Sequence, residues 1–303
     1  MFADRRLRLV TLLAAAAVVV VVALLLVPGK THRTAPAGPA RYYVALGDSL
    51  ALGMQPDPTG NVVASRVGYV NALYAYYRRQ IPNLKLVEFG CSGETIDSML
   101  AGHPTDPAKP LGCSNGGQLA AAQAFLRTHS AKGEVPLLTI DIGMQDVACV
   151  RSTTVASLIC MYNAIESVGS NAAALLQRLQ RVVPAGTVTA GMSAYSPLLG
   201  SFSGTSGGPL LDEAVVLMDQ VNASLVAAYR KSHFLVADVA TAFDIANIAP
   251  TKNPSYGNTP ANVVAACTLT WQCAPAPQGP SFLPNATGYG LIAARYEHVI
   301  GTL

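Results

Sequence analysis

Hydrophobic residues along the chain gather into five short apolar runs, and longer segments of mixed character separate them. The runs lie at about Tyr42–Leu46, Leu84–Phe89, Val135–Ile142, Thr187–Ser193 and Phe234–Val239. Their length, their β-branched and aromatic content and the glycines that follow several of them are typical of buried strands. The pattern therefore predicts five strands.

The segments between these runs carry apolar residues at helical spacing. In the first, Val70, Leu73, Tyr74 and Tyr77 recur three or four residues apart before Pro82 ends the pattern. Helices are predicted over residues 67–80, 117–129, 153–182, 210–231 and 287–300. Irregular structure is predicted for the Pro-containing loop around His103 and for residues 248–286. Strands that alternate with helices indicate a parallel sheet covered on both faces, in one three-layer α/β/α domain over residues 41–303.

The N-terminal segment has a different character. Three arginines, Arg5, Arg6 and Arg8, precede an uncharged run from Leu9 to Val27, which is just long enough to cross a bilayer as a helix. Residues 1–29 are therefore interpreted as a signal peptide or an N-terminal membrane anchor, and residues 30–40 as a tether. The run exceeds a usual signal core, and the cleavage-like pattern Ala35-Pro36-Ala37 lies well beyond it, which favours the anchor. Either reading predicts an extracytoplasmic domain, secreted or held at the membrane.

Charge and cysteine content narrow the classes of function. The net charge of +3 falls when the basic leader is set aside, so nothing indicates binding to nucleic acid. The six cysteines all follow the export segment, and an even number there indicates disulfides. Six cysteines allow fifteen pairings, and their clustering favours three local ones. These are Cys91–Cys113, Cys149–Cys160 and Cys267–Cys273. No Cys-x-x-Cys or His-x-x-x-His spacing accompanies them, so neither a metal nor another cofactor is predicted.

Three residues that could take part in catalysis follow predicted strands. Ser49 stands after Gly47-Asp48, Gly93 lies in the turn Gly90–Thr95, and Gln145 follows Gly143-Met144. In a doubly wound sheet these strand ends meet at one crevice. A serine there is a candidate nucleophile, although it needs a base and oxyanion donors. The alternative is an ordinary strand-to-helix turn in which Ser49 or Asp48 caps the helix.

Taken together, these blocks resemble the GDSL or SGNH hydrolase family of serine esterases and lipases. Gly47-Asp48-Ser49-Leu50 is similar to the first block, Gly93 to the second, and Gly143-Met144-Gln145-Asp146 to the third. Pro284-Asn285 resembles the residues that follow the family's catalytic histidine. The resemblance implies a monomeric, bacterial, exported protein with a flavodoxin-like five-stranded fold and three disulfides, acting on an acyl ester, a lipid or an acylated glycan. It implies Ser49 as nucleophile, with the Ser49 and Gly93 N–H groups and the Gln145 side chain as oxyanion donors.

Two departures from the family pattern bear on activity. Gln145 replaces the usual asparagine, which keeps a carboxamide on a longer arm. Leu283 stands where the resemblance places the histidine base, and Ser281 is the nearest residue to the lost acid. Of the five histidines, only His103 is kept as a candidate substitute base, because the others are expected to be solvated surface or tether residues. Asp48 is expected to hold the turn by hydrogen bonds. The sequence thus predicts a weakened ester hydrolase, or alternatively a pseudoenzyme that binds an acylated lipid or glycan.

Overall fold

The computed structural model describes residues 38–102, 113, 116–147, 154–196, 198–205 and 207–303. Its centre is a parallel sheet in the order β4-β1-β5-β6-β7. The strands are β1 (Arg41–Gly47), β4 (Leu84–Glu88), β5 (Leu137–Asp141), β6 (Val188–Met192) and β7 (Leu235–Ala237). This is the doubly wound, flavodoxin-like order in which the first strand lies between the second and the third. The five predicted strands and the predicted sheet type are therefore confirmed.

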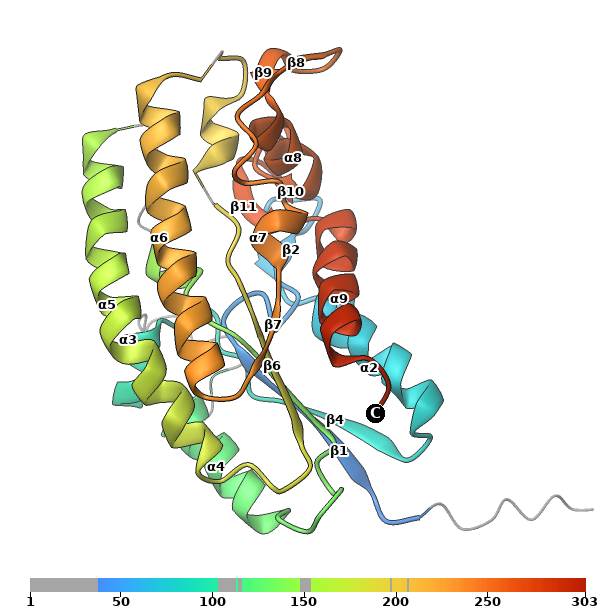
Figure 1. Cartoon of the computed structure of the whole chain (residues 1–303). Coiled ribbons are helices and arrows are strands. Elements are labelled where there is room, and N and C mark those ends of the chain that lie inside the picture. Colours follow the sequence, from blue (N-terminus) through green and yellow to red (C-terminus); the bar gives the residue numbers. More distant parts are fainter. Residues whose placement is uncertain (1–37, 103–112, 114–115, 148–153, 197, 206) are drawn as a thin grey trace, which may run out of the picture. The chain divides into compact units, whose positions relative to one another are not determined.

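Helices cover both faces of this sheet (Figure 1). On one side α2 (Tyr69–Gln80) packs against α9 (Ala286–Ile300), and on the other α5 (Val155–Gln180) packs along α6 (Pro209–Lys231). The short α3 (Ile96–Ala101) contacts both α5 and α4 (Gln118–Thr128). The five predicted helices agree with α2, α4, α5, α6 and α9 to within a few residues.

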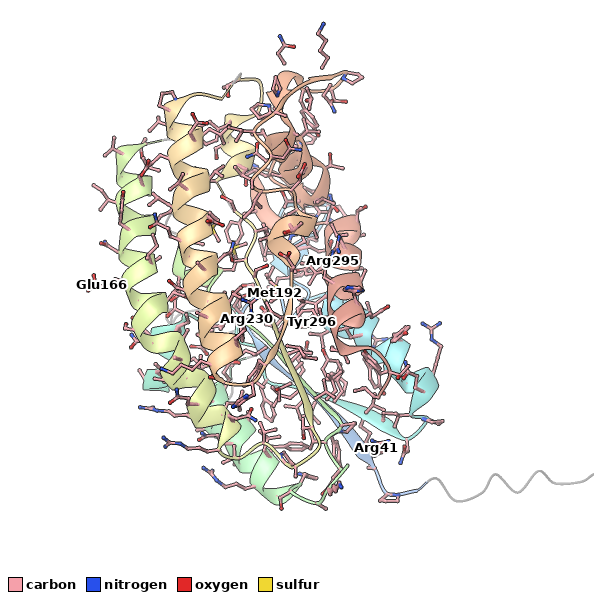
Figure 2. The ribbon with its side chains drawn as sticks, viewed as in Figure 1. Arg41, Glu166, Met192, Arg230, Arg295 and Tyr296 are labelled. Atoms are coloured by element: carbon pink, nitrogen blue, oxygen red, sulfur yellow. A yellow bond between two sulfur atoms is a disulfide. The ribbon has the colours of Figure 1, made fainter. Side chains whose placement is uncertain are left out.

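Buried tyrosines form much of the contact between helices and sheet. The rings of Tyr69 in α2 and Tyr296 in α9 stack with centroids 5.0 Å apart. The hydroxyl of Tyr296 donates to the Ile140 carbonyl of β5 at 3.0 Å, so the buried phenol keeps a partner. Figure 2 shows Tyr296 directed into the interior, whereas the exposed Glu166 of α5 points away from it.

The irregular structure predicted for residues 248–286 is wrong. This region holds the hairpin β8 (Pro250–Asn253) and β9 (Gly257–Pro260), the helix α8 (Ala261–Leu269), and the paired strands β10 (Thr270–Trp271) and β11 (Ser281–Pro284). The strands are too short to show a period, and α8, with the sequence ANVVAACTL, lacks a polar face. The helix α8 is stabilised by its packing against α9, a contact that the local sequence pattern does not show.

Smaller elements complete the chain. They are β2 (Gln55–Pro56) paired with β3 (Val62–Val63), α7 (Val239–Ala242), and the 3₁₀ turns η1 (Gln145–Val147) and η2 (Leu199–Phe202). No helix among the described residues is both long and apolar enough to span a bilayer. The segment Leu9–Val27 lies outside the described residues, so its role as signal or anchor stays a prediction.

Candidate active site

Ser49 follows the carboxyl end of β1, which lies between β4 and β5 in the sheet. Its side chain is half-buried, and its Oγ is 3.1 Å from the Oγ of Ser92. The backbone N–H of Gly93 donates to the same Ser49 Oγ, with the nitrogen 3.4 Å away. The structure thus brings together the predicted nucleophile and one predicted oxyanion donor, which are 44 residues apart in sequence.

The turn that presents Ser49 is held by side chains from distant elements. Gly47 has φ +145°, and a Cβ there would lie 2.1 Å from Oδ1 of Asp141, so only glycine fits. The carboxamide of Gln118 in α4 accepts the Gly47 N–H at 3.0 Å and donates to the Gly47 carbonyl at 2.9 Å. Its Nε2 also donates to Oε2 of the buried Glu94, at 2.9 Å. This buried clamp fixes the path of the chain into Ser49.

Asp48 holds the same turn from inside. Its Oδ1 accepts the N–H of Leu50 at 2.8 Å, closing an Asx turn, as the sequence predicts. The backbone N–H of Gln145, the first residue of η1 after β5, lies near enough to the Asp48 carboxylate to lower the pKa of Asp48. Gln145 is half-buried, and its backbone therefore lies at the same edge as Ser49. The oxyanion role of its side chain stays a prediction.

The glycine turn after β4 aims the Gly93 amide. Its start is pinned by the Cys91 N–H, which donates to the Gly47 carbonyl at 3.0 Å, and by the disulfide Cys91–Cys113. Gly93 has φ +81°, a left-handed conformation that glycine adopts without strain. Thr95 then caps α3 by accepting the Ser98 N–H, and the Ser98 hydroxyl accepts the Thr95 N–H in return. The sequence predicts a loop here, although a threonine and a serine three residues apart could have indicated the start of this helix.

Carboxyl groups gather beneath the crevice. Asp48 and Asp141 are buried side by side, and the Asp48 N–H donates to Oδ2 of Asp141 at 3.3 Å. Burial raises the pKa of Asp48 to about 6, and burial together with the Asp48 charge raises the pKa of Asp141 well above its usual value. Burial also raises the pKa of Asp146 to about 7, partly offset by the Ile96 N–H that its carboxyl accepts. Through these hydrogen bonds the carboxyl groups organise the turns that follow β1 and β5.

The last block supplies no base. Leu283 lies in β11, is 5% exposed and belongs to the apolar core. Its N–H donates to the Ser281 hydroxyl at 3.4 Å. The Tyr289 hydroxyl of α9 donates to the Met54 carbonyl at 2.7 Å, which ties the chain after Leu283 to the segment after Ser49. The block therefore keeps its attachment to the Ser49 turn, while the residue in the predicted base position has no proton acceptor.

The described histidines lie toward the amino-terminal ends of the strands, the opposite end from Ser49. The ring of His129 stacks on Phe125 and packs against Tyr42 at the start of β1. His233 directly precedes β7, and His298 lies in the last turn of α9, close to the end of α2. His103 and His32 lie outside the described residues, so the proposal of His103 as a substitute base is untested.

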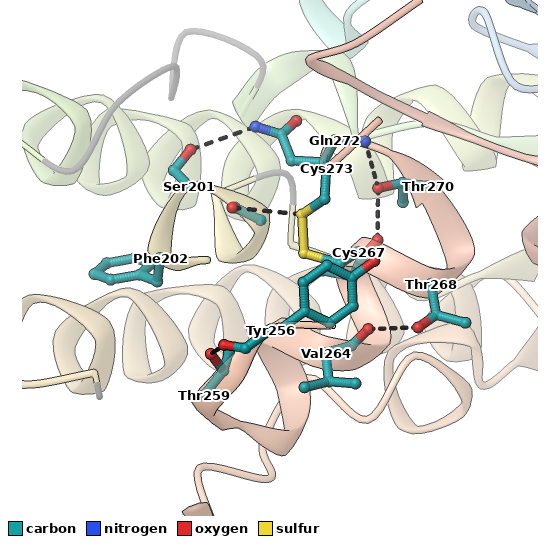
Figure 3. Close-up of a disulfide and its surroundings, with 12 residues drawn as sticks. Ser201, Phe202, Tyr256, Thr259, Val264, Cys267, Thr268, Thr270, Gln272 and Cys273 are labelled. Carbon is teal, nitrogen blue, oxygen red and sulfur yellow. Dashed lines mark hydrogen bonds between the residues drawn. A yellow bond between two sulfur atoms is a disulfide. The ribbon is translucent and has the colours of Figure 1, made fainter. Parts of the chain in front are cut away.

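Two of the three expected disulfides are present, Cys91–Cys113 and Cys267–Cys273. Cys160 is also disulfide-bonded, but its expected partner Cys149 lies outside the described residues. Figure 3 shows Cys267–Cys273 linking α8 to the second residue after β10, with Cys273 Sγ 3.8 Å from the Gly200 carbonyl. In the part of the chain that the structure describes, no three His, Cys, Asp or Glu side chains are grouped to hold a metal ion.

Sequence reasoning missed several residues of the site. The Ser92 hydroxyl that faces Ser49 is part of the Gly-Cys-Ser-Gly turn, in which the sequence pattern indicates a role only for Gly93. The roles of Gln118 and Asp141 depend on contacts 71 and 93 residues away in the chain, which no local pattern shows.

Comparison with known proteins gives the fold. No family model and no curated protein sequence matches the chain. Among solved structures, Axe2, an acetylxylan esterase from Geobacillus stearothermophilus, is 15% identical with a TM-score of 0.50, over 88% of this chain and 97% of that one. LAE5, an alpha/beta hydrolase enzyme from the metagenome of Lake Arreo in Spain, is 17% identical with a TM-score of 0.50, over 87% and 97%. The sheet order and these likenesses show that the chain has the three-layer α/β/α fold of the SGNH hydrolases.

Proposed function

We propose that this protein is an exported SGNH-type serine ester hydrolase whose activity is weakened by its last block. The Gly93 N–H that points at the Ser49 Oγ from 3.4 Å carries the proposal. A backbone donor beside a strand-end serine is the arrangement that stabilises charge on an attacked carbonyl oxygen. The fold shared with solved esterases and hydrolases supports it, and the two disulfides fit a domain outside the cytoplasm.

In the proposed reaction, the Ser49 Oγ forms a bond to the acyl carbon of an ester. The carbonyl oxygen becomes an oxyanion held by the Gly93 and Ser49 N–H groups and by the Gln145 carboxamide. The Ser49 proton leaves to solvent, and the leaving alkoxide takes a proton as the C–O bond breaks. Water then repeats the addition on the acyl-serine and releases the acid.

The missing base sets the expected rate. The Ser92 hydroxyl, 3.1 Å away, can pass a proton to water, but its basicity matches that of Ser49 and provides no driving force. Without a triad base, oxyanion stabilisation and binding leave about 10³–10⁴-fold acceleration over water. The substrate is proposed to be an acyl ester of a lipid or a glycan, met in solution or at the membrane through the N-terminal segment.

Hydrolysis of p-nitrophenyl acetate by the purified protein and by Ser49→Ala tests this function. The parent should be at least about tenfold faster than the variant, since the oxyanion donors act only on an adduct of Ser49. Equal rates for two folded proteins would overturn the proposal.

A second candidate, a pseudoenzyme that holds an acylated ligand without turnover, is favoured by the buried Leu283. A leucine in the base position makes the site more apolar, which suits an acyl chain better than proton transfer. This candidate predicts that p-nitrophenyl esters raise the melting temperature of the protein while no nitrophenol is released above the Ser49→Ala background. Ester turnover that depends on Ser49 would exclude it.

A further inference from the structure

A groove of about 370 Å³ lies between the β2–β3 turn and the segment that leads into β11. Ser49 is not among its lining residues. Its walls come from Gly60 and Val62 on one side and from Gln278 to Phe282 on the other, with Ser201 and Gln272 between them. The volume falls within the range of about 300–1,000 Å³ typical of small-ligand sites.

The groove has fixed walls. A Cβ at Gly60 would lie 2.3 Å from the Pro277 carbonyl oxygen, so the turn and the segment are in direct contact there. The Tyr195 hydroxyl donates to the Phe282 carbonyl at 2.9 Å. Figure 3 shows Gln272 reaching Ser201, with its Nε2 donating to the Ser201 Oγ at 3.4 Å, next to the Cys267–Cys273 disulfide. Walls held in this way lose little freedom when a ligand binds.

The lining combines polar and apolar groups and carries no charged side chain. Two carboxamides, Gln272 and Gln278, and two hydroxyls, Ser201 and Ser281, face the groove together with the Phe282 and Val62 side chains. Among the described residues the Gln278 carboxamide has no hydrogen-bond partner, so its donors and acceptor are open to a ligand. Val62 is 45% exposed and adds apolar surface.

This chemistry selects one class of ligand. An anion would find no cationic side chain in the lining, and a cation would find no carboxylate. A lipid chain would leave the Gln278 carboxamide without a partner, which carries a free-energy cost. A neutral sugar offers hydroxyls to the carboxamides and a C–H face to the Phe282 ring.

We propose that this groove binds a neutral oligosaccharide. Binding there requires no reaction at Ser49, so it can be measured separately from ester hydrolysis. If the proposed hydrolase function holds as well, the groove binds the glycan that carries the ester.

Isothermal titration of the full-length protein with xylohexaose, cellohexaose, maltohexaose and chitohexaose tests the proposal, with hexagalacturonate as a charged comparison. At least one neutral hexasaccharide should bind more tightly than hexagalacturonate. Gln278→Ala should weaken that binding about five- to tenfold, the loss of roughly one hydrogen bond. The matched control Gln177→Ala removes an exposed glutamine of α5, far from the groove, and should leave it unchanged.

Phe282→Leu keeps an apolar side chain and the backbone carbonyl that Tyr195 holds, so it tests the ring alone and should weaken binding about threefold. Absence of binding to all four neutral sugars would overturn the proposal. Binding that is unchanged in both Gln278→Ala and Phe282→Leu would overturn it too, because the sugar would then occupy another surface.

Discussion

Restoring the missing base is the perturbation that the structure makes most informative. Leu283→His combined with Ser281→Asp would place an imidazole and a carboxylate on β11, two residues apart. The Ser281 hydroxyl already accepts the Leu283 N–H at 3.4 Å, so one oxygen of the new aspartate can keep that bond. The other oxygen is then free to orient the ring and stabilise its charged form.

The double substitution should change the rate and the stability in opposite directions. One positioned general base contributes at least about 10²-fold, which corresponds to about 2.7 kcal/mol of transition-state free energy. Leu283 is only 5% exposed, so removing it sacrifices about 1.5–3 kcal/mol of burial free energy. The double variant should therefore hydrolyse esters at least about 10²-fold faster than the parent while unfolding at lower urea concentration. Leu283→His alone should gain less, because the tautomer and orientation of the ring are unset.

The assay is the initial rate of p-nitrophenyl acetate hydrolysis, with folding checked by circular dichroism. The control is the same double variant with Ser49→Ala, which should lose the whole gain. A folded double variant no faster than the parent would show that β11 does not present residue 283 to Ser49. A gain that survives Ser49→Ala would show that the new histidine acts alone, and the placement of the site would be withdrawn.

Three further predictions follow from the same geometry. Gly93→Ala should destabilise the fold by about 1 kcal/mol, because φ is +81° there, whereas Gly290→Ala in the helix α9 should stabilise it by about 0.5–1 kcal/mol. A Cβ meets open space at both sites, so urea unfolding of the two variants measures the backbone effect alone. Equal shifts in the two variants would contradict this reasoning. Gln118→Ala should lower the free energy of unfolding by at least about 2 kcal/mol, because the buried Gly47 N–H loses its partner and the buried Glu94 carboxylate loses a donor; a loss under 1 kcal/mol would refute the clamp. The folded chain holds the Asp146 proton more tightly than the unfolded chain, with a pKa of about 7 against 3.8, so its stabilising contribution is complete below about pH 4 and disappears as the pH rises through 7. The urea midpoint should fall between pH 5 and pH 8, and by less in Asp146→Asn; an equal fall in both proteins would assign the effect to other groups.

The sheet could be predicted from the sequence because its strands are short and apolar, and because most of the segments between them carry a clear helical period. The run Val135–Ile142, for example, is nearly unbroken because β5 is covered on both faces. Residues 248–286 gave no such signal, because β8 to β11 are only two to four residues long and α8 is mostly apolar without a polar face.

The candidate site likewise contains residues that a local sequence pattern indicates and residues that it does not. Ser49 and Gly93 could be identified from glycine turns at strand ends, since such turns have a local pattern. The Gln118 clamp and the paired Asp48 and Asp141 carboxyls could not, because each depends on side chains that meet only after the sheet has formed. Leu283 shows its importance only as a departure from a family pattern, and its burial explains how the fold keeps a leucine there.

The central claim is that Ser49 and the Gly93 N–H together hold a tetrahedral anion, whether or not turnover is fast. Boron-11 NMR of the protein with an alkylboronic acid tests it directly, because a serine–boronate adduct is tetrahedral and its formation needs no leaving group. The account predicts a tetrahedral boron signal with the parent protein, weakened in Gly93→Ala and absent in Ser49→Ala. A tetrahedral signal of equal intensity in the parent and Ser49→Ala, or none with the parent, would contradict it.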